Sequence, residues 1–171
     1  MMGNRGVLRA GREFEHRHWV CCVLDCKRDL AAPRQYTKLF FVDEATALAA
    51  GHRPCGMCRR SDYNDFKAAG IRGNSAPWSS VDEVLHRERL GGRPELEFDS
   101  VPDGCMVEWA GQPHLVKGDS LLLWTHGGYA GRVERPKGAM VRVLTPMSIV
   151  GTLRAGYPVK WDPESAMLPK S

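Results

Sequence analysis

Four cysteines of this chain lie in two close pairs, which is the spacing of metal ligands. Three residues separate Cys22 from Cys26, two separate Cys55 from Cys58, and 28 residues lie between the pairs. A short gap within each pair lets two thiolates reach one ion, and two such pairs complete a tetrahedral zinc site. The spacing therefore predicts a four-cysteine Zn²⁺ site formed by Cys22, Cys26, Cys55 and Cys58.

The chemistry of such a site leaves alternatives open. Cys21 adjoins Cys22 and could replace it as a ligand, whereas Cys105 lies in a strand-like segment and is interpreted as a small buried residue. A site with four cysteine ligands has no open position for a substrate, which favours a structural role. A thioredoxin-type redox motif at Cys55 and Cys58 is less favoured, because a helix and a proline turn precede it instead of a strand.

Charge is unevenly distributed along the 171 residues. The net charge is +4, but residues 1–73 carry 13 Lys and Arg against 8 Asp and Glu, and residues 74–171 carry 11 against 12. The positive excess belongs to the half with the paired cysteines and favours a partner that carries phosphate. No apolar run approaches the roughly 18–20 residues of a spanning helix, and we expect no signal peptide. We expect a cytoplasmic protein without a membrane partner or a nucleotide cofactor; the oligomeric state is not indicated.

Hydrophobic periodicity and turn residues predict an α+β fold. Helix starts are expected at Asp43, at Ser80 in a capping box with Glu83, and at Thr145. The expected elements are strands over 19–24 and 36–42, helices over 43–50, 62–70 and 81–90, strands over 106–109, 113–116, 120–124 and 140–144, a helix over 146–154 and a strand over 157–161.

These elements divide the chain into three parts. Residues 1–73 are expected to form a zinc-stapled module with a mobile or loosely packed arm over 1–17. Residues 74–98 form a connector with a short helix, and residues 99–171 a small, mostly antiparallel β-rich domain with one helix and no assigned role. The Gly-rich loop over 124–129 shows no recognised spacing of nucleophile and base.

The segment from Leu39 to Asp62 reads L-F-F-V-D-E-A-T-A-L-A-A-G-H-R-P-C-G-M-C-R-R-S-D and resembles the zinc-binding domain of the bacterial Ada DNA-repair protein. The resemblance covers about residues 18–66, and the first cysteine pair matches by spacing alone. It implies that the four paired cysteines bind zinc and that Cys22 also accepts a methyl group from a DNA methylphosphotriester. It further implies that Arg53 supports the DNA phosphate.

The chain departs from the family around the first cysteine pair. Val23 replaces the arginine that follows the first ligand, and Asp25 would face a phosphate unfavourably. The remaining candidates for phosphate contact are the cations that adjoin the ligands in sequence: Lys27, Arg28, Arg59 and Arg60.

The leading hypothesis is a bacterial, zinc-binding, Ada-like protein that contacts DNA through its basic zinc module in a response to DNA damage or modification. One alternative is a methyl-acceptor repair enzyme that uses zinc-bound Cys22. Another is a structural zinc module for protein–protein interaction. These hypotheses include both enzymatic and non-enzymatic functions.

Overall fold

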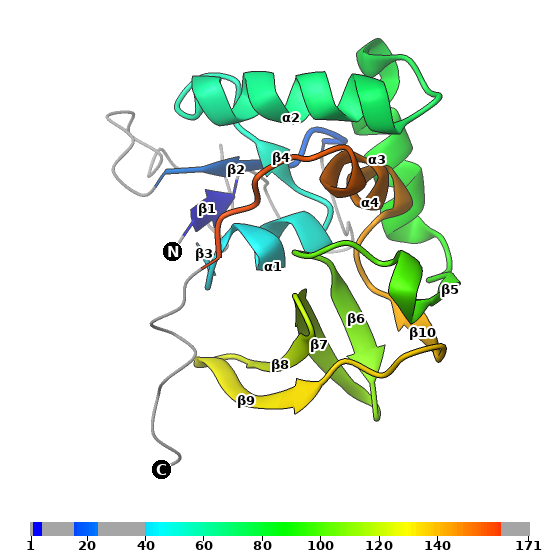
Figure 1. Cartoon of the computed structure of the whole chain (residues 1–171). Helices are drawn as coiled ribbons and strands as arrows, with labels where there is room; N and C mark the ends of the chain where they lie inside the picture. The colour runs from blue at the N-terminus through cyan, green and yellow to red at the C-terminus, as the bar shows by residue number, and fades with distance from the viewer. Residues whose placement is uncertain (1, 5–15, 24–39, 162–171) are drawn as a thin grey trace.

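The computed structural model describes residues 2–4, 16–23 and 40–161. They form an α+β fold with a small four-stranded sheet and a larger six-stranded sheet. Figure 1 shows the helices gathered above the larger sheet, with the small sheet to one side of them. The predicted fold class is therefore confirmed.

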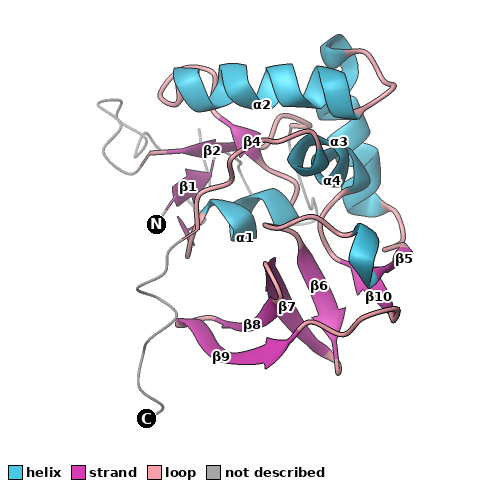
Figure 2. Ribbon diagram, in the orientation of Figure 1, coloured by secondary structure: helices cyan, strands magenta, loops and turns pink. Residues whose placement is uncertain are grey.

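The larger sheet is antiparallel throughout. Its strands are β5 (Glu95–Glu97), β6 (Met106–Trp109), β7 (Gln112–Lys117), β8 (Ser120–Thr125), β9 (Gly128–Glu134) and β10 (Met140–Val143). They are ordered β5-β10-β6-β7-β8-β9 (Figure 2). Two-residue turns join β6 to β7 and β7 to β8, where Ala110, Gly111 and Gly118 adopt positive φ angles. The four strands expected over 106–144 are confirmed, and β5 and β9 are additional.

The central strands are buried on both faces. Leu115 pairs with Met106 and Leu122 on one face, while Val116 pairs with Leu121 on the other. The two faces pack into two separate hydrophobic clusters. Burial on both faces explains the consecutive apolar residues at 115–116 in β7 and 121–124 in β8, whereas a strand with one solvated face alternates.

The described residues contain four α-helices and two short 3₁₀ turns. They are α1 (Glu44–Ala49), α2 (Arg60–Gly73), α3 (Val81–Leu90) and α4 (Met147–Arg154), with η1 (Trp78–Ser80) and η2 (Phe98–Ser100). Asp43 caps α1 as expected, since its carboxylate accepts a hydrogen bond of 2.8 Å from the backbone N–H of Thr46.

Three sequence-based expectations about these elements are wrong. Ser80 forms no capping box, because its hydroxyl donates to the carbonyl of Pro77. Thr145 does not cap α4; its hydroxyl oxygen accepts from the backbone N–H of Met106 at 2.8 Å. Residues 157–161 form no strand and instead cross over α1.

Helix α2 continues past Gly70, the expected end, to Gly73. Both glycines serve close packing: a Cβ on Gly70 would lie 2.8 Å from the ring of Trp78, and one on Gly73 would clash with the carbonyl of Gly151 in α4. The absence of side chains lets α2 and α4 cross at short range, so these glycines mark a helix crossing.

The small sheet brings distant segments together. Its strands are β1 (Met2–Asn4), β2 (Val20–Cys22), β3 (Phe40–Phe41) and β4 (Arg53–Pro54), ordered β3-β1-β2-β4. Strand β1 is antiparallel to both neighbours, and β2 is parallel to β4. Residues 2–4 are thus not part of a loose arm, and the proline turn expected before Cys55 is instead the paired strand β4.

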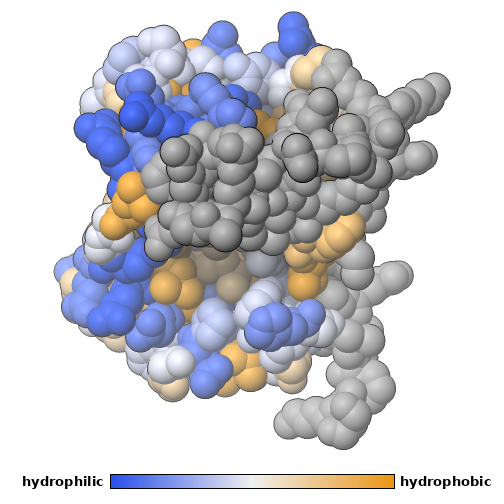
Figure 3. Space-filling view, turned by 180° about the vertical axis from the view of Figure 1, so that it is seen from behind, coloured by the Kyte–Doolittle hydropathy of each residue, from blue (hydrophilic) through white to orange (hydrophobic). Residues whose placement is uncertain are grey.

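One hydrophobic core joins the three parts into which the sequence was divided. Its fully buried members include Leu48, Phe66, Leu85, Val107, Leu121 and Ile149. On the face seen in Figure 3, hydrophobic residues of the described ranges lie in small patches among hydrophilic ones. None of the helices in the described ranges combines the length and hydrophobicity that crossing a bilayer requires.

Candidate metal centre

Three cysteines gather beside the small sheet. The sulfur atoms of Cys22, Cys55 and Cys58 lie within 4.8 Å of one another. Parallel pairing of β2 with β4 produces this arrangement, because it aligns the strand that ends at Cys22 with the one that Cys55 follows. Three thiols at this spacing could hold a metal ion. The expected fourth ligand, Cys26, lies outside the described residues.

Cys21 does not belong to the cluster. Successive side chains of a strand point to opposite faces, and the Cys21 sulfur lies 3.5 Å from Nη1 of Arg59. Burial raises the pKa of Cys21 to about 12. The geometry thus favours Cys22 over Cys21 as the ligand from β2. Cys105 is fully buried, as expected, and burial raises its pKa to about 12 as well.

Within the cluster, one sulfur is favoured as the thiolate. A hydrogen bond with Cys22, assisted by the backbone N–H groups of Cys58 and Met57, lowers the pKa of Cys55 to about 4 despite its burial. The same contact raises the pKa of Cys22, and burial raises that of Cys58. Hydrogen-bond donors from a neighbouring thiol and from the main chain thus favour a thiolate at Cys55, the form in which cysteine binds a metal.

Backbone hydrogen bonds fix Cys55 on both sides. Its N–H donates to the carbonyl of Cys21 at 3.0 Å, and its own carbonyl accepts from the N–H of Arg59 at 3.0 Å. The first bond ties the second cysteine pair to β2, and the second ties it to the start of α2. The positions of the sulfur atoms are thus set by the main chain.

Arg59 lies behind the cysteines in a buried ion network. Its side chain is 2% exposed, and Nη2 lies 2.5 Å from Oε1 of the fully buried Glu44 and 2.6 Å from Oδ2 of Asp62. Burial lowers its pKa, but Glu44 and Asp62 raise it more, so the net shift is upward. Arg59 has no exposed face for a phosphate, which corrects the expectation that it contacts a nucleic acid.

The segment after α4 completes this network. The hydroxyl of Tyr157 donates to Oε1 of Glu44 at 2.7 Å, and the backbone N–H of Lys160 donates to Oε2 at 2.8 Å. The ammonium group of Lys160 also lies 2.7 Å from Oδ1 of Asp62. Burial and the Glu44 carboxylate raise the pKa of Tyr157. The buried Glu44 carboxylate therefore connects Arg59, which lies behind the cysteines, to the segment that follows α4.

An open hollow of about 620 Å³ lies beside the cysteines, and we call it the basic hollow. Two of its lining side chains, Arg53 and Arg60, carry a formal charge, and none of the described lining residues is acidic. The other lining residues include His16, His18, Cys55 and Tyr63. A cationic depression next to a thiolate cluster suits an anionic ligand.

Arg53 is held in the wall of the basic hollow by Asp82 of α3. Its Nε and Nη2 each lie 2.7 Å from a carboxylate oxygen of Asp82, in a bidentate pair. Burial lowers the pKa of Arg53 and this pair raises it, with a net rise. Arg89, also a residue of α3, lies just beyond the end of α1 and donates a bond of 2.7 Å to the carbonyl of Gly51.

The other expected phosphate contacts have different placements. Arg60 is exposed, and its Nη1 donates to the carbonyl of Gly56 at 3.1 Å, which leaves the guanidinium at the rim of the basic hollow. Lys27 and Arg28 lie outside the described residues.

His52 is a buried residue whose environment the sequence did not indicate. Its ring lies between Trp19 and Phe41, with centroid separations of 5.1 and 4.8 Å. Burial, together with the nearby Arg89 charge, lowers the pKa of His52 to about 3. His52 is thus a neutral packing residue outside the cysteine cluster.

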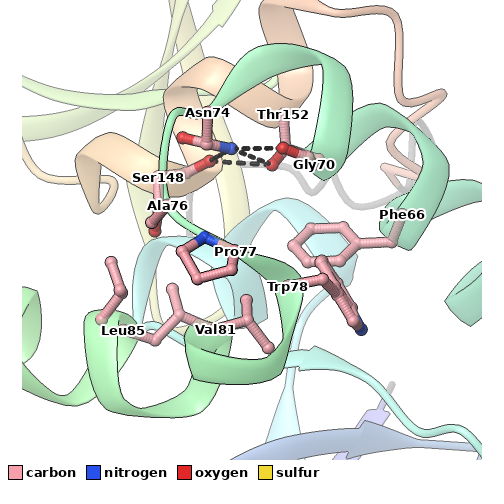
Figure 4. A pocket seen from close by; sticks show the side chains of 11 residues that line it. Phe66, Gly70, Asn74, Ala76, Pro77, Trp78, Val81, Leu85, Ser148 and Thr152 are labelled. Carbon is pink, nitrogen blue, oxygen red and sulfur yellow. Dashed lines mark hydrogen bonds between the residues drawn. The ribbon is translucent and has the colours of Figure 1, made fainter.

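A second, smaller cavity of about 20 Å³ lies between α2, α3 and α4 (Figure 4). The amide nitrogen of Asn74 lies 3.0 Å from the carbonyl oxygens of Gly70 and Ser148 and 3.3 Å from the hydroxyl of Thr152. Its apolar wall includes Phe66, Trp78 and Leu85. A cavity of this size holds about one water molecule, so it is a packing gap, too small for a substrate.

The aromatic and histidine residues of the larger sheet form no catalytic arrangement within the described residues. His114 is buried, and its Nδ1 lies 2.9 Å from the carbonyl of Gln112. Trp124 packs against the second hydrophobic cluster, and its ring lies 5.1 Å from that of the exposed His126. These contacts are those of edge and packing residues.

No protein-family model, no curated protein and no solved structure matches this chain. Function is therefore inferred from the cysteine cluster and the basic hollow beside it.

Proposed function

We propose that this protein binds one zinc ion through Cys22, Cys26, Cys55 and Cys58. The observation that carries the proposal is the approach of three cysteine sulfurs to within 4.8 Å of one another from two separate segments. Cys26 completes the set by its spacing from Cys22. Thiolates are soft ligands that select zinc over hard cations, and four of them match its tetrahedral preference.

The metal would stabilise a part of the fold that has little core of its own. The strands of the small sheet are two or three residues long, and the hydrophobic cluster beside the site contains Val20, Cys22 and Cys55 with Cys58 packed against it. So small a cluster supplies little free energy of folding, and a structural zinc ion compensates in many small modules.

The partner we propose is DNA, bound through its phosphates at the basic hollow. Arg53 and Arg60 lie in its wall, and the described lining residues include no Asp or Glu. The resemblance of residues 18–66 to the Ada zinc-binding domain supports the same partner. Phosphate contacts of this kind give affinity without sequence specificity.

A salt titration of DNA binding tests this proposal. Binding of a fluorescent duplex to the zinc-loaded protein is measured from about 50 to 200 mM salt, where each phosphate contact contributes about −0.9 to the slope of log K against log salt. We expect Arg60→Gln to weaken binding and to make the slope shallower by about 0.9. A shallower slope of log K against log salt in Arg60→Gln shows that Arg60 contacts a phosphate.

A matched control removes the same charge elsewhere. Arg142 on β10 is half-exposed, lies 3.4 Å from Glu108 and does not line the basic hollow. Arg142→Gln should leave both affinity and slope unchanged. Equal effects of the two substitutions, or no binding by the wild-type protein at the lowest salt, would contradict the proposal.

A second candidate function is methyl transfer from a phosphotriester to a cysteine of the cluster. The observation that favours it is that Cys55 lines the basic hollow, although Cys22 is the acceptor that the resemblance implies and is 1% exposed. A thiolate would attack the methyl carbon, forming an S–CH₃ bond as the O–CH₃ bond breaks and a phosphodiester anion leaves. Zinc, when bound, would keep the thiols deprotonated.

Mass spectrometry of the protein after incubation with methylphosphotriester DNA tests this candidate. One transfer adds about 14 Da, the mass of a methylene group, and peptide mapping assigns it to a cysteine. An unchanged mass rules out the transfer under these conditions. If DNA binding also fails, a structural zinc module for protein–protein contacts becomes the preferred function.

A further inference from the structure

Asp82 lies at the meeting point of two side chains of the basic hollow. Its carboxylate accepts both hydrogen bonds of the Arg53 fork at 2.7 Å, and Oδ2 lies 2.6 Å from Nδ1 of His18. Asp82 itself belongs to α3 and does not line the hollow. Asp82, which lies in α3 and not among the cysteines, therefore holds two side chains that line the basic hollow, those of Arg53 and His18.

The geometry of the Arg53–Asp82 pair is the geometry by which arginine binds phosphate. Two parallel N–H···O bonds join the planar guanidinium to two oxygens, as they would join it to a phosphate group. Both side chains are 13% exposed, so water screens the pair only in part. Asp82 occupies Nε and Nη2 of the Arg53 guanidinium, so a ligand cannot bind to these two nitrogen atoms.

This occupation changes the charge of the basic hollow. The Asp82 carboxylate neutralises Arg53, which leaves Arg60 as the one unpaired cation among the described lining residues that carry a formal charge. A hollow with one free cation suits a single backbone phosphate, whereas two free cations would also attract a more highly charged anion.

We propose that Asp82 is a specificity-determining residue, an internal anion that holds the Arg53 fork and limits the basic hollow to one phosphodiester contact. This inference rests on the proposed binding of DNA at the same hollow. It differs from a purely structural role for Asp82, because a structural tie would not change the number of phosphates that the protein contacts.

The test compares the salt dependence of duplex binding for zinc-loaded wild-type protein and Asp82→Asn. Freeing Arg53 should add one phosphate contact, which steepens the slope of log K against log salt by about 0.9. An increase from about 50 to 200 mM salt should then weaken binding by an additional factor of about 3.5. In Asp82→Asn/Arg53→Gln, the slope should return to the wild-type value.

Glu83→Gln is the matched control. Glu83 is the next residue of α3, pairs with the exposed Arg17 at 3.6 Å and makes no contact with Arg53, yet its substitution removes the same formal charge. We expect the wild-type slope for this variant. Zinc content and the thermal transition of each variant establish that it is folded.

The outcomes separate this inference from the proposed function. Wild-type binding with an unchanged or shallower slope in Asp82→Asn overturns the inference alone, as does equal steepening in Glu83→Gln. Binding by neither wild type nor Asp82→Asn overturns both. Binding by Asp82→Asn alone, abolished by Arg53→Gln, refutes DNA binding by the wild-type protein and overturns the limit of one phosphodiester contact, because the wild-type hollow then makes none.

Discussion

Substitution of Arg59 by methionine should strongly destabilise the fold, because it leaves the buried Glu44 carboxylate without its cation. Glu44 is fully buried and accepts from Arg59, from the hydroxyl of Tyr157 and from the backbone N–H of Lys160. Methionine keeps the length of the side chain but removes the positive charge. Glu44 would then face two neutral donors with no compensating cation.

The expected loss is about 3–5 kcal/mol, the usual effect of removing one partner from a buried ion pair. Glu44→Gln should also destabilise, since its amide N–H₂ would meet donor groups. The double variant Arg59→Met/Glu44→Gln removes both charges, so it should lose less than the sum of the single losses, with a coupling of about 1–3 kcal/mol.

Urea unfolding of the zinc-loaded variants measures these free energies, with Arg60→Met as the control. Arg60 is the next residue and is exposed, so its replacement should change stability by no more than about 0.5 kcal/mol. A loss below about 1 kcal/mol for Arg59→Met, or strict additivity in the double variant, would refute the buried network.

Two further predictions concern packing and pH. Gly73→Ala should destabilise by about 1–3 kcal/mol, because the new Cβ clashes with the Gly151 carbonyl, whereas Gly92→Ala meets nothing within 4 Å and should be neutral in urea unfolding. Equal stability of these two variants would argue against the close helix crossing. Burial lowers the pKa of His52 from 6.5 to about 3. Below about pH 6.5 the unfolded chain therefore binds a proton at His52 that the folded protein does not bind. The free energy of unfolding should fall as the pH falls from about 6.5 toward about 3. At about 1.4 kcal/mol per pH unit, the loss should reach about 2 kcal/mol near pH 5. His52→Phe should remove this loss, so the difference in the free energy of unfolding between wild type and variant should change with pH at matched zinc content. A difference that does not change with pH would exclude His52 as the source of the loss.

Local signals in the sequence predicted a large part of the fold. Asp43 before an Ala-rich run predicted the start of α1, and the apolar runs over 106–109, 113–116 and 120–124 predicted three strands, which pair as two hairpins. Each signal involves residues close in sequence, so backbone preference decides the outcome. The spacing of Cys55 and Cys58 predicted their approach for the same reason.

Other features depend on tertiary contacts that no local pattern records. Strand β9 begins in a Gly-rich segment that reads as a loop, but pairing with β8 overrides the local preference. The contact of Arg53 with Asp82 spans 29 positions. Arg59 and Arg60 look alike in sequence, yet adjacent residues at a helix start point in directions about 100° apart, so one is buried and the other exposed.

Metal analysis of the purified protein, combined with X-ray absorption spectroscopy, tests the central claim most directly. The account predicts about one zinc per chain with four sulfur ligands at about 2.3 Å. Zinc should be lost or weakened in serine variants of Cys22, Cys26, Cys55 and Cys58 and retained in Cys21→Ser. Absence of zinc, its retention in Cys22→Ser, or its loss in Cys21→Ser would contradict the four-cysteine centre on which the proposed function rests.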